Sequence, residues 1–179
     1  MKFCSSCGHG IVHQVPSDDN RPRAICTHCE TIHYVNPRLI LGTLSTWQDQ
    51  ILLCRRAIEP RAGLWTLPAG FMELGESTEA GALRETLEEA GAEAKIQDLF
   101  AIFDIPHVEQ VHLFFRADLV SPTLAPGVES LEARLFRAEE LPWDELAFES
   151  VRQALELFLE DRAAGQYRLH RRCLVRMDW

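Results

Sequence analysis

The stretch that decides the fold is Gly70–Ala92, which reads GFMELGESTEAGALRETLEEAGA. In a helix, Glu85, Glu88 and Glu89 fall within an arc of roughly 100°, because one turn takes about 3.6 residues. Glu85 and Glu89 form a like-charged pair one turn apart, which costs on the order of 0.2–0.5 kcal/mol. The helix dipole also disfavours anions in the last turn, by about 0.3–1 kcal/mol. A hard divalent cation would reverse the sign of each of these terms.

The rest of this segment has the pattern of an amphipathic helix. Ser77 or Thr78 can cap its N-terminus, and Gly91 can end it. On the side opposite the glutamates, an apolar stripe is expected to face the core. The stripe consists of Ala80, Leu83, Leu87 and Ala90. Composition alone would also allow the glutamates to be an ordinary solvated face.

The spacing of the glycines and charges argues against that bland interpretation. The segment matches the pattern G-x5-E-x7-R-E-U-x-E-E-x-G-U, in which U is usually apolar. The matching residues are Gly70, Glu76, Arg84, Glu85, Thr86, Glu88, Glu89, Gly91 and Ala92. Thr86 and Ala92 are weak fits to U. This pattern is the Nudix box, and the chain closely resembles a Nudix hydrolase. The resemblance implies an α/β fold, the Nudix α/β/α sandwich with a mixed sheet, over about residues 36–165.

Length and composition predict one main domain with a small appendage. The chain has 179 residues, of which 46% are apolar and 25% charged, as in an ordinary globular protein. The net charge of −9 excludes the binding of polyanions by bulk attraction, so an anionic substrate needs local arginines and metal ions. The sequence shows no transmembrane run and no signal-peptide core, which predicts a cytoplasmic protein without a membrane partner.

The appendage is expected to be a small zinc ribbon at residues 1–35. Two cysteine pairs with the spacing C-x2-C-x18-C-x2-C are typical of a structural Zn²⁺ site with four thiolates. They are Cys4, Cys7, Cys26 and Cys29. A pair of disulfides is the alternative, which the lack of a secretory signal disfavours. His9 or His28 could also replace one ligand. The segment has too few large apolar residues to fold without an ion.

The remaining sequence alternates between strand and helix patterns, which is typical of α/β or α+β layers. A second helix is expected from about Phe148 to Ala164, where Gly165 ends it. Residues 166–179 are expected to form a closing strand or a tail. The expected strands of the main domain lie near residues 39–47, 50–56, 64–71, 95–103, 110–120 and 133–137.

The Nudix resemblance implies hydrolysis of a diphosphate bond in a nucleoside diphosphate linked to another group. It also implies a catalytic Mg²⁺ or Mn²⁺, since hard cations bind carboxylate and carbonyl oxygens. By position in the motif, the metal ligands are Glu85, Glu88, Glu89 and the carbonyl of Ala69. Arg84 and Glu76 are expected to orient these carboxylates by ion pairing, although a plain surface salt bridge is the alternative.

Two further groups of residues are candidates for catalysis and substrate binding. The general base is either a box glutamate or a loop acid, Glu129 or Glu132. Neighbouring strand residues point to opposite faces, so at most one of Arg55 and Arg56 can face the site. His112 could contact substrate or be a plain strand residue. The candidates for phosphate binding and base stacking are Arg38, Arg55, Arg61, Trp47 and Phe103.

The substrate is expected to be ADP-ribose or FAD, cut to AMP and the other phosphorylated half. Nudix enzymes with a four-cysteine ribbon include NADH pyrophosphatases and an FAD/ADP-ribose pyrophosphatase-like group. The first group carries a Ser-Gln-Pro-Trp-Pro-Phe-Pro-like run after the box, where this chain has LFAIFDIP at residues 99–106. The resemblance therefore favours the second group, and it implies a homodimer that acts on a small nucleotide.

Three other functions stay open as alternatives. NADH pyrophosphatase activity is one, and processing of RNA 5′ ends is another, although the acidic chain disfavours nucleic acid as a partner. The third is a non-catalytic sensor of ADP-ribose built on the same fold. Such sensors typically lose a box glutamate, whereas Glu85, Glu88 and Glu89 are all present here.

Overall fold

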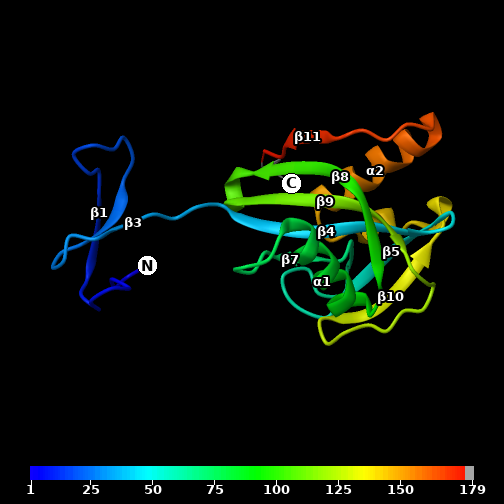
Figure 1. Ribbon diagram of the computed structural model, residues 1–179, viewed down its shortest axis with the longest axis horizontal. Helices are drawn as coiled ribbons and strands as arrows, with labels where there is room; N and C mark the ends of the chain where they lie inside the picture. Colours follow the sequence, from blue (N-terminus) through cyan, green and yellow to red (C-terminus); the bar gives the residue numbers. More distant parts are fainter. Residues whose placement is uncertain (176–179) are drawn as a thin grey trace. The chain divides into compact units, whose positions relative to one another are not determined.

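The computed structural model describes residues 1–175 and divides the chain into two compact units, Met1–Asn36 and a second unit that begins at Pro37 (Figure 1). The first unit is a three-stranded antiparallel sheet in the order β1-β2-β3. Its strands are β1 (Ile11–Gln14), β2 (Arg23–Cys26) and β3 (Ile32–His33). The buried apolar residues of this unit are few and small, namely Cys4, Ala24 and Cys26.

The second unit is built on a mixed sheet with the strand order β10-β5-β4-β9-β8-β11. β4 pairs with β9 in parallel and β11 pairs with β8 in parallel, whereas the other neighbours are antiparallel. This arrangement confirms the predicted mixed sheet. Its strands are β4 (Arg38–Trp47), β5 (Gln50–Arg56), β8 (Ala94–Ile105), β9 (Gln110–Leu119), β10 (Ser130–Phe136) and β11 (His170–Cys173).

Two helices cover opposite faces of this sheet, α1 (Thr78–Ala90) and α2 (Glu149–Ala164) (Figure 1). Phe114 and Phe115 are neighbours on β9 and therefore point to opposite faces. Phe114 belongs to the large core cluster with α2, and Phe115 packs with Ala82 of α1. The result is the α/β/α sandwich. Short 3₁₀ helices join the elements at η1 (Pro106–Val108), η2 (Ala138–Glu140) and η3 (Trp143–Glu145).

The expected strand over residues 64–71 is two short strands, β6 (Trp65–Thr66) and β7 (Ala69–Phe71). β6 pairs with β5, whereas β7 pairs with β4. Pro68 lies between the two strands and has no N–H to donate, but its carbonyl accepts a hydrogen bond from the Thr43 amide at 3.1 Å. Because of this break the chain pairs first with β5 and then with β4, and β7 lies next to α1.

The apolar stripe expected on α1 is wrong for most of its members: Ala90 is buried, but Leu83 is partly exposed, and Ala80 and Leu87 are exposed. The buried residues of α1 are Gly81, Ala82, Glu85, Thr86, Glu89 and Ala90, whereas Leu87 is 53% exposed. The helix therefore turns Glu85 and Glu89 inward, whereas Glu79 and Glu88 are exposed. Two features permit this orientation: a Cβ at Gly81 would lie 2.6 Å from Leu41, and the Thr86 hydroxyl lies 2.7 Å from that of Thr43. Small residues and a hydrogen-bonded hydroxyl take the place of the large apolar side chains.

The ends of both helices follow local chemistry. The Ser77 side chain accepts a hydrogen bond from the Ala80 amide, and Gly91 ends α1 in the left-handed conformation. Gly165 ends α2 in the same way. After α2, residues 170–173 form β11 on the main sheet, and residues 176–179 of the expected strand or tail lie outside the described residues. Within residues 1–175, no helix is long and apolar enough to cross a membrane.

Candidate active site

The carboxylates of α1 meet strand β7 in a crowded, mostly buried position. Glu85 is 9% exposed and Glu89 is 8% exposed. A Cβ placed on Gly70 would lie 2.3 Å from a carboxylate oxygen of Glu85, which is far inside van der Waals contact. A side chain at this position would therefore displace the Glu85 carboxylate, so glycine lets that carboxylate lie directly against β7. The first glycine of the box has a steric role that can be read directly from the structure.

Glu89 carries the least satisfied polar atom of this cluster. Its Oε2 is buried and has no hydrogen-bond partner among the described residues. Burial raises the pKa of Glu89 to about 8, the charge of Glu85 adds to the shift, and the amide of Ala69 and the charge of Arg56 oppose it. Burial also raises the pKa of Glu85, although Arg84 opposes that shift. Two buried carboxylates with a free oxygen fit a hard divalent cation.

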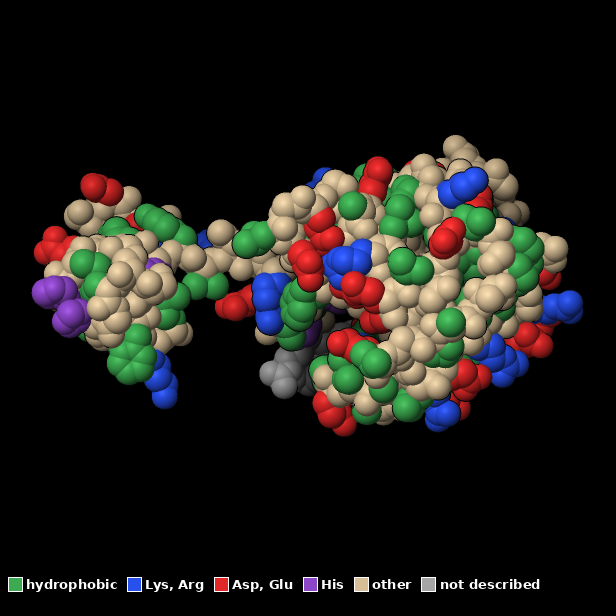
Figure 2. All heavy atoms as spheres, turned by 60° about the horizontal axis from the view of Figure 1, so that its bottom comes forward, with side chains coloured by type: hydrophobic (Ala, Val, Ile, Leu, Met, Phe, Trp, Pro, Cys, Tyr) green, Lys and Arg blue, Asp and Glu red, His purple; other side chains and the backbone are tan. Residues whose placement is uncertain are grey.

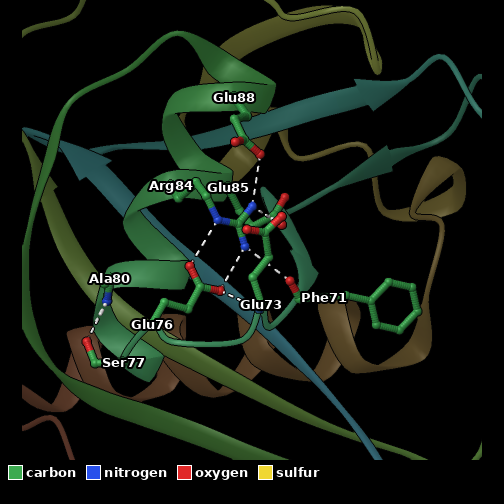
Figure 3. Close-up of polar contacts among 8 residues, drawn as sticks. All are labelled: Phe71, Glu73, Glu76, Ser77, Ala80, Arg84, Glu85 and Glu88. Atoms are coloured by element: carbon green, nitrogen blue, oxygen red, sulfur yellow. Dashed lines mark hydrogen bonds and ion pairs between the residues drawn. The ribbon is translucent and has the colours of Figure 1, made fainter. Parts of the chain in front are cut away.

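Arg84 is the cation that holds the carboxylates apart and in place (Figure 3). It donates to both carboxylate oxygens of Glu76 at 3.0 Å, to Glu85 at 2.7 Å and to Glu88 at 2.9 Å. It also donates to the carbonyl oxygen of Phe71 at 3.1 Å. The hydrogen bond from Arg84 lowers the pKa of Glu76. An arginine with all its donors engaged, and a side chain only 23% exposed, orients its partners far better than a plain surface salt bridge.

A cavity of about 1310 Å³ opens beside this cluster. Its wall includes α1, β7, the loop after β5, the loop before β10, the start of α2 and the chain just after β11. Acidic and basic side chains interleave on the face of the second unit that Figure 2 shows, rather than forming a patch of one sign. The size suits a ligand larger than a single phosphate group, because binding sites for organic ligands typically enclose about 300–1,000 Å³.

The loop before β10 is fastened to the C-terminal end of α1. The Ala125 amide donates to the carbonyl of Ala90 at 2.7 Å, and the Gly127 amide donates to that of Glu89 at 3.2 Å. A Cβ on Gly127 would lie 1.9 Å from the Glu88 carbonyl oxygen, so this contact also requires glycine. The loop therefore satisfies helix carbonyls that have no partner within the helix, and it places Glu129 on the cavity wall.

The structure brings some of the predicted substrate residues to the cavity and leaves others out. Arg61 lines it, and so does Arg56. Arg55 instead donates to the carbonyl of Gly63 at 2.8 Å on the other side of β5. Glu132 is exposed on β10, with its Cα opposite that of Arg55, and does not line the cavity. Of the two adjacent arginines Arg56 lines the cavity, and of the two candidate acids Glu129 does.

The remaining candidates lie outside the cavity. The Arg38 guanidinium lies over the ring of Phe71, 5.0 Å from its centroid. Trp47 packs against a separate core cluster that contains Leu52. Phe103 has 0% exposure and is a core aromatic. No described contact connects these three side chains with the carboxylates, and base stacking on Phe103 would require the core to open.

At the far end of the cavity, near the start of α2, sequence reasoning named His112 as a possible substrate contact but missed Gln110, Phe148 and Ser150. Phe148, Ser150, Gln110 and His112 line this end, together with Arg56. The Arg56 guanidinium lies over the Phe148 ring at 5.1 Å, so it connects this end with the carboxylates. The adjacency of β9 and α2 arises only from tertiary packing. The alternation of His112 and Gln110 along β9 was the one signal in the sequence that could have indicated a shared face.

The cysteines of the first unit form the second cluster of ligand atoms. The four sulfurs of Cys4, Cys7, Cys26 and Cys29 lie within 4.8 Å of one another, and all four are free thiols. Backbone amides at Ser6, His28 and Cys29 donate to sulfur at 3.4 Å, as expected where thiolates carry negative charge. The set fits a tetrahedral zinc ion. His33 Nε2 also lies 3.3 Å from the Cys4 sulfur, so it is the histidine next to the cluster, rather than His9 or His28.

Comparison with known proteins assigns both units to described families. The family described as Nudix N-terminal matches residues 2–35, and the family described as NUDIX domain matches residues 38–158. The structure is similar to the crystal structure of a NUDIX hydrolase from Nitrosomonas europaea, with a TM-score of 0.95 and 47% identity, covering 97% of this chain and 99% of that one.

Two curated relatives have named activities. The chain is 31% identical over 122 residues to an ADP-ribose pyrophosphatase of Methanocaldococcus jannaschii, which covers 65% of this chain and 70% of the relative. It is 29% identical over 169 residues to the NAD-capped RNA hydrolase NudC of Pseudomonas aeruginosa, which covers 92% of this chain. The chain spans little more than half the length of the NudC relatives, 58% in this case.

Proposed function

Because the chain belongs to the Nudix hydrolase family, we propose that it hydrolyses the diphosphate bond of ADP-ribose or FAD to give AMP and the other phosphorylated half. The observation that carries this proposal is the unpartnered, buried Oε2 of Glu89 in a complete box, beside a cavity large enough for a dinucleotide. The similarity to an ADP-ribose pyrophosphatase supports the choice of substrate. The complete set of box glutamates argues against a non-catalytic sensor.

The residues that fit the catalytic metal are Glu85, Glu88, Glu89 and the carbonyl of Ala69. When bound, Mg²⁺ or Mn²⁺ would neutralise charge on the diphosphate and acidify the attacking water. The chain itself supplies the positioning. Arg84 holds Glu85 and Glu88 at 2.7 and 2.9 Å, and the buried Oε2 of Glu89 has no hydrogen-bond partner among the described residues. Two cavity arginines, Arg56 and Arg61, are available to bind the phosphate oxygens bidentately.

Glu129 is the loop residue that we propose as the general base. It is exposed at the cavity wall, and its charge contributes to the raised pKa values of Glu85 and Glu89 after burial, which is the main cause. A carboxylate near the cluster that does not belong to it can take the proton of the attacking water. Glu132, which lies outside the cavity, is the natural comparison for this role.

The ribbon is proposed to hold a structural Zn²⁺, because its four free thiols are already gathered within 4.8 Å. Free thiols in this arrangement also favour a reducing compartment, so a cytoplasmic location is part of the proposal. We further propose a homodimer, which sedimentation equilibrium of the purified chain would detect as twice the mass of 20.4 kDa. A monomeric mass at all protein concentrations in the micromolar range would contradict the proposed homodimer.

A second candidate function is hydrolysis of NADH or of NAD-capped RNA. The observation that favours it is the match to NudC, which covers 92% of this chain and therefore includes the ribbon. An RNA substrate would make binding strongly dependent on salt, because phosphate contacts release counterions. Binding to a short RNA that does not change between low and high salt would exclude this candidate.

The test of the main proposal is a substrate panel with identified products. ADP-ribose, FAD, NADH, diadenosine polyphosphates, nucleoside triphosphates and NAD-capped RNA are each incubated with the protein and Mg²⁺ or Mn²⁺. The expected result is AMP from ADP-ribose or FAD at a higher kcat/KM than from any other member. If NADH or NAD-capped RNA is hydrolysed with the highest kcat/KM, the second candidate function replaces the main proposal. If no member of the panel is hydrolysed, the protein is better described as a non-catalytic sensor.

A further inference from the structure

The chain that follows α2 returns to the sheet and contributes part of the cavity wall. Cys173, Leu174 and Val175 line the cavity. The Leu174 amide donates a hydrogen bond to the Asp104 carbonyl of β8 at 2.8 Å, and Figure 1 shows β11 beside β8. This section of the wall lies beyond residues 38–158, which match the NUDIX domain family, and the chemistry proposed above gives it no role.

The pairing of β11 does little to hold this section in place. The strand has four residues, pairs with β8, and is the last one in the order of the sheet. Arg171, Arg172 and Cys173 are exposed, so these side chains bury little apolar area. Short elements at the edge of a fold, with few buried contacts, open more readily than the core. A further contact is therefore needed to keep residues 173–175 at the cavity.

That contact is a buried hydrogen bond between β11 and α2. His170 Nε2 lies 2.8 Å from Asp161 Oδ2, and the two side chains are 9% and 5% exposed. Burial acts to raise the pKa of Asp161, but hydrogen bonds from His170 and from the Arg168 amide hold the pKa below its ordinary value. The carboxylate is therefore charged and can only accept, so His170 is the donor. The His170 ring also lies edge-on to Phe100, with 5.1 Å between the ring centroids.

Asp161 also fixes the turn that leads from α2 to β11. Its Oδ2 accepts a second hydrogen bond from the Arg168 amide at 3.0 Å. Its backbone carbonyl accepts one from the Gln166 amide at 3.1 Å. One residue of α2 thus binds Gln166, Arg168 and His170 in turn, and two of these three contacts use its side chain. Replacement of the carboxylate would therefore release the segment that carries β11.

A second and weaker attachment lies nearer the cavity. Arg172 shares a face of β11 with His170, because side chains alternate along a strand, and its Nη1 donates to Gln153 Oε1 at 3.3 Å. Gln153 in turn donates to Glu149 at 2.8 Å, and both of these residues line the cavity. The contact of Arg172 is exposed, where water competes for each partner and the net contribution is small. The position of β11 therefore depends mainly on the buried pair.

We propose that Asp161 and His170 are positioning residues for the substrate: their hydrogen bond holds β11 at the edge of the sheet, and β11 places residues 173–175 in the cavity wall. The inference deepens the proposed function and rests on it for the identity of the substrate. Asp161 and His170 do not themselves line the cavity, so their loss changes how often the wall is complete and leaves the carboxylate cluster as it is. A site that is complete about a tenth of the time binds its ligand about 10-fold more weakly.

The experiment measures steady-state kinetics with ADP-ribose and Mg²⁺ for Asp161→Ala, His170→Ala and the double variant. We expect each single change to raise KM about 10-fold and to leave kcat within about 2-fold, because saturating substrate restores the complete wall. The double variant should resemble either single one, since both remove the same hydrogen bond, whereas independent effects would multiply to about 100-fold. Asp161→Asn retains an acceptor oxygen and should keep KM within about 3-fold of the parent's value.

Two further measurements do not depend on turnover. Binding of α,β-methylene ADP-ribose, whose bridge cannot be hydrolysed, should be about 10-fold weaker in Asp161→Ala by calorimetry. Amide hydrogen exchange of residues 170–174 should be at least about 10-fold faster in that variant, while exchange in β9 keeps the parent's rate. Glu156→Ala, which changes an exposed acid of the same helix, is the control and should match the parent in every measurement. Thermal unfolding identifies a variant that fails to fold, and if Asp161→Ala does so, His170→Ala decides.

Three results would overturn the positioning role. They are an unchanged KM in both single variants, multiplied effects in the double variant, and a lower kcat with KM unchanged. Faster amide exchange without a change in KM belongs to the first of these, because the pair would then stabilise β11 without affecting the substrate. A parent that binds the analogue but hydrolyses no nucleotide would contradict the proposed function, and the binding ratios would then decide the positioning role. A parent that binds no nucleotide would contradict both.

Discussion

The two units of this chain hold their prospective metal ligands in opposite ways. In the ribbon, two of the four cysteines, Cys4 and Cys26, are themselves most of what is buried. In the second unit, Glu85 and Glu89 lie at the edge of a core that contains Phe100, Phe114 and many aliphatic residues. An ion would therefore hold the fold together in the first case, and in the second the fold holds the ligands in place for an ion.

The difference teaches what each kind of site requires from its sequence. A ribbon needs only the spacing of soft ligands and tight knuckles, because the ion supplies the missing core. A carboxylate cluster needs a scaffold strong enough to bury charge. Here the scaffold includes Arg84, the close approach at Gly70, and a loop fastened to the end of α1 through Gly127. The following predictions test that contrast, beginning with the largest effect.

The ribbon should lose its fold when one ligand is removed. Structural zinc in small domains binds with about 10–16 kcal/mol of apparent free energy, which here exceeds any stability the ribbon has by itself. We expect Cys26→Ser to abolish bound zinc and to collapse the amide dispersion of residues 1–36 in NMR spectra, while the signals of the second unit stay in place. Cys173→Ser, outside the ribbon, should retain one zinc per chain. If the ribbon signals of Cys26→Ser stay dispersed, the ribbon folds without zinc, and the contrast between the two units is wrong.

The carboxylate cluster should behave in the opposite way. We expect Glu89→Gln to lower kcat by about 10³-fold, at the upper end of what one lost electrostatic group costs, and to leave the fold intact. In the presence of a chelator the variant should unfold at the parent's temperature or above it, because a buried carboxyl whose charged form is disfavoured is replaced by a neutral amide. Glu139→Gln, an exposed change in η2, is the matched control. If Glu89→Gln loses its structure cooperatively, the core of the second unit depends on the Glu89 side chain, which contradicts this prediction.

The two loop acids sharpen the comparison within the second unit. We expect Glu129→Gln to lower kcat by about 10²-fold, the size associated with a lost general base, and Glu132→Gln to change it less than about 2-fold. The reason is position, since Glu129 lines the cavity and Glu132 does not. Single-turnover rates at saturating substrate measure the effect. If both changes lower kcat by less than about 2-fold, neither loop acid is the general base, and a box glutamate takes that role.

The smallest expected effect concerns the pH dependence of the second unit without metal. The pKa of His112 is lowered by burial from 6.5 to about 4, so between these values the unfolded chain binds a proton that the folded chain does not. The contribution of His112 to the free energy of unfolding therefore falls as pH drops from about 6.5 to about 4, by on the order of 2 kcal/mol, and it is fully present above pH 6.5. The raised pKa of Glu89 acts in the opposite direction, so the effect of His112 is read from the difference between the parent and a His112 variant.

Chemical denaturation in a chelator across this pH range measures the effect. The destabilisation of the parent relative to His112→Asn should grow by this amount as pH falls from about 6.5 to about 4, whereas the difference between the parent and His107→Asn, an exposed residue of η1, should stay constant. Identical slopes for the parent and His112→Asn would mean that the histidine is not held neutral in the folded state.

The parts of the site that could be predicted from sequence are those fixed by short spacing. The box residues and the cysteine pairs are close in the chain, so their local geometry follows from one helix or one knuckle. Helix periodicity failed for α1 because it assumes that apolar residues face inward. The burial of Glu85 and Thr86 depends on the close fit at Gly81 and the hydroxyl contact with Thr43, which are tertiary features.

Substrate residues were harder to predict for a related reason. Strand alternation predicts that Arg55 and Arg56 face opposite sides, but only the packing of α2 and the loop after β5 decides which side is the cavity. Phe103 looked like a stacking residue because exposure cannot be read from a single strand, and it is a core residue. The hydrogen bond between His112 and Ser150 joins residues 38 positions apart in sequence.

The sequence by itself determined the chemistry that this chain carries. Four thiols at knuckle spacing and three glutamates at helical spacing each specify a class of ligand without reference to the rest of the fold. Only the tertiary structure decided where that chemistry acts, which arginine and which loop acid face the cavity, and how far the cavity extends. The physical reason is that ligand spacing is a property of adjacent residues, whereas burial depends on surfaces contributed by distant ones.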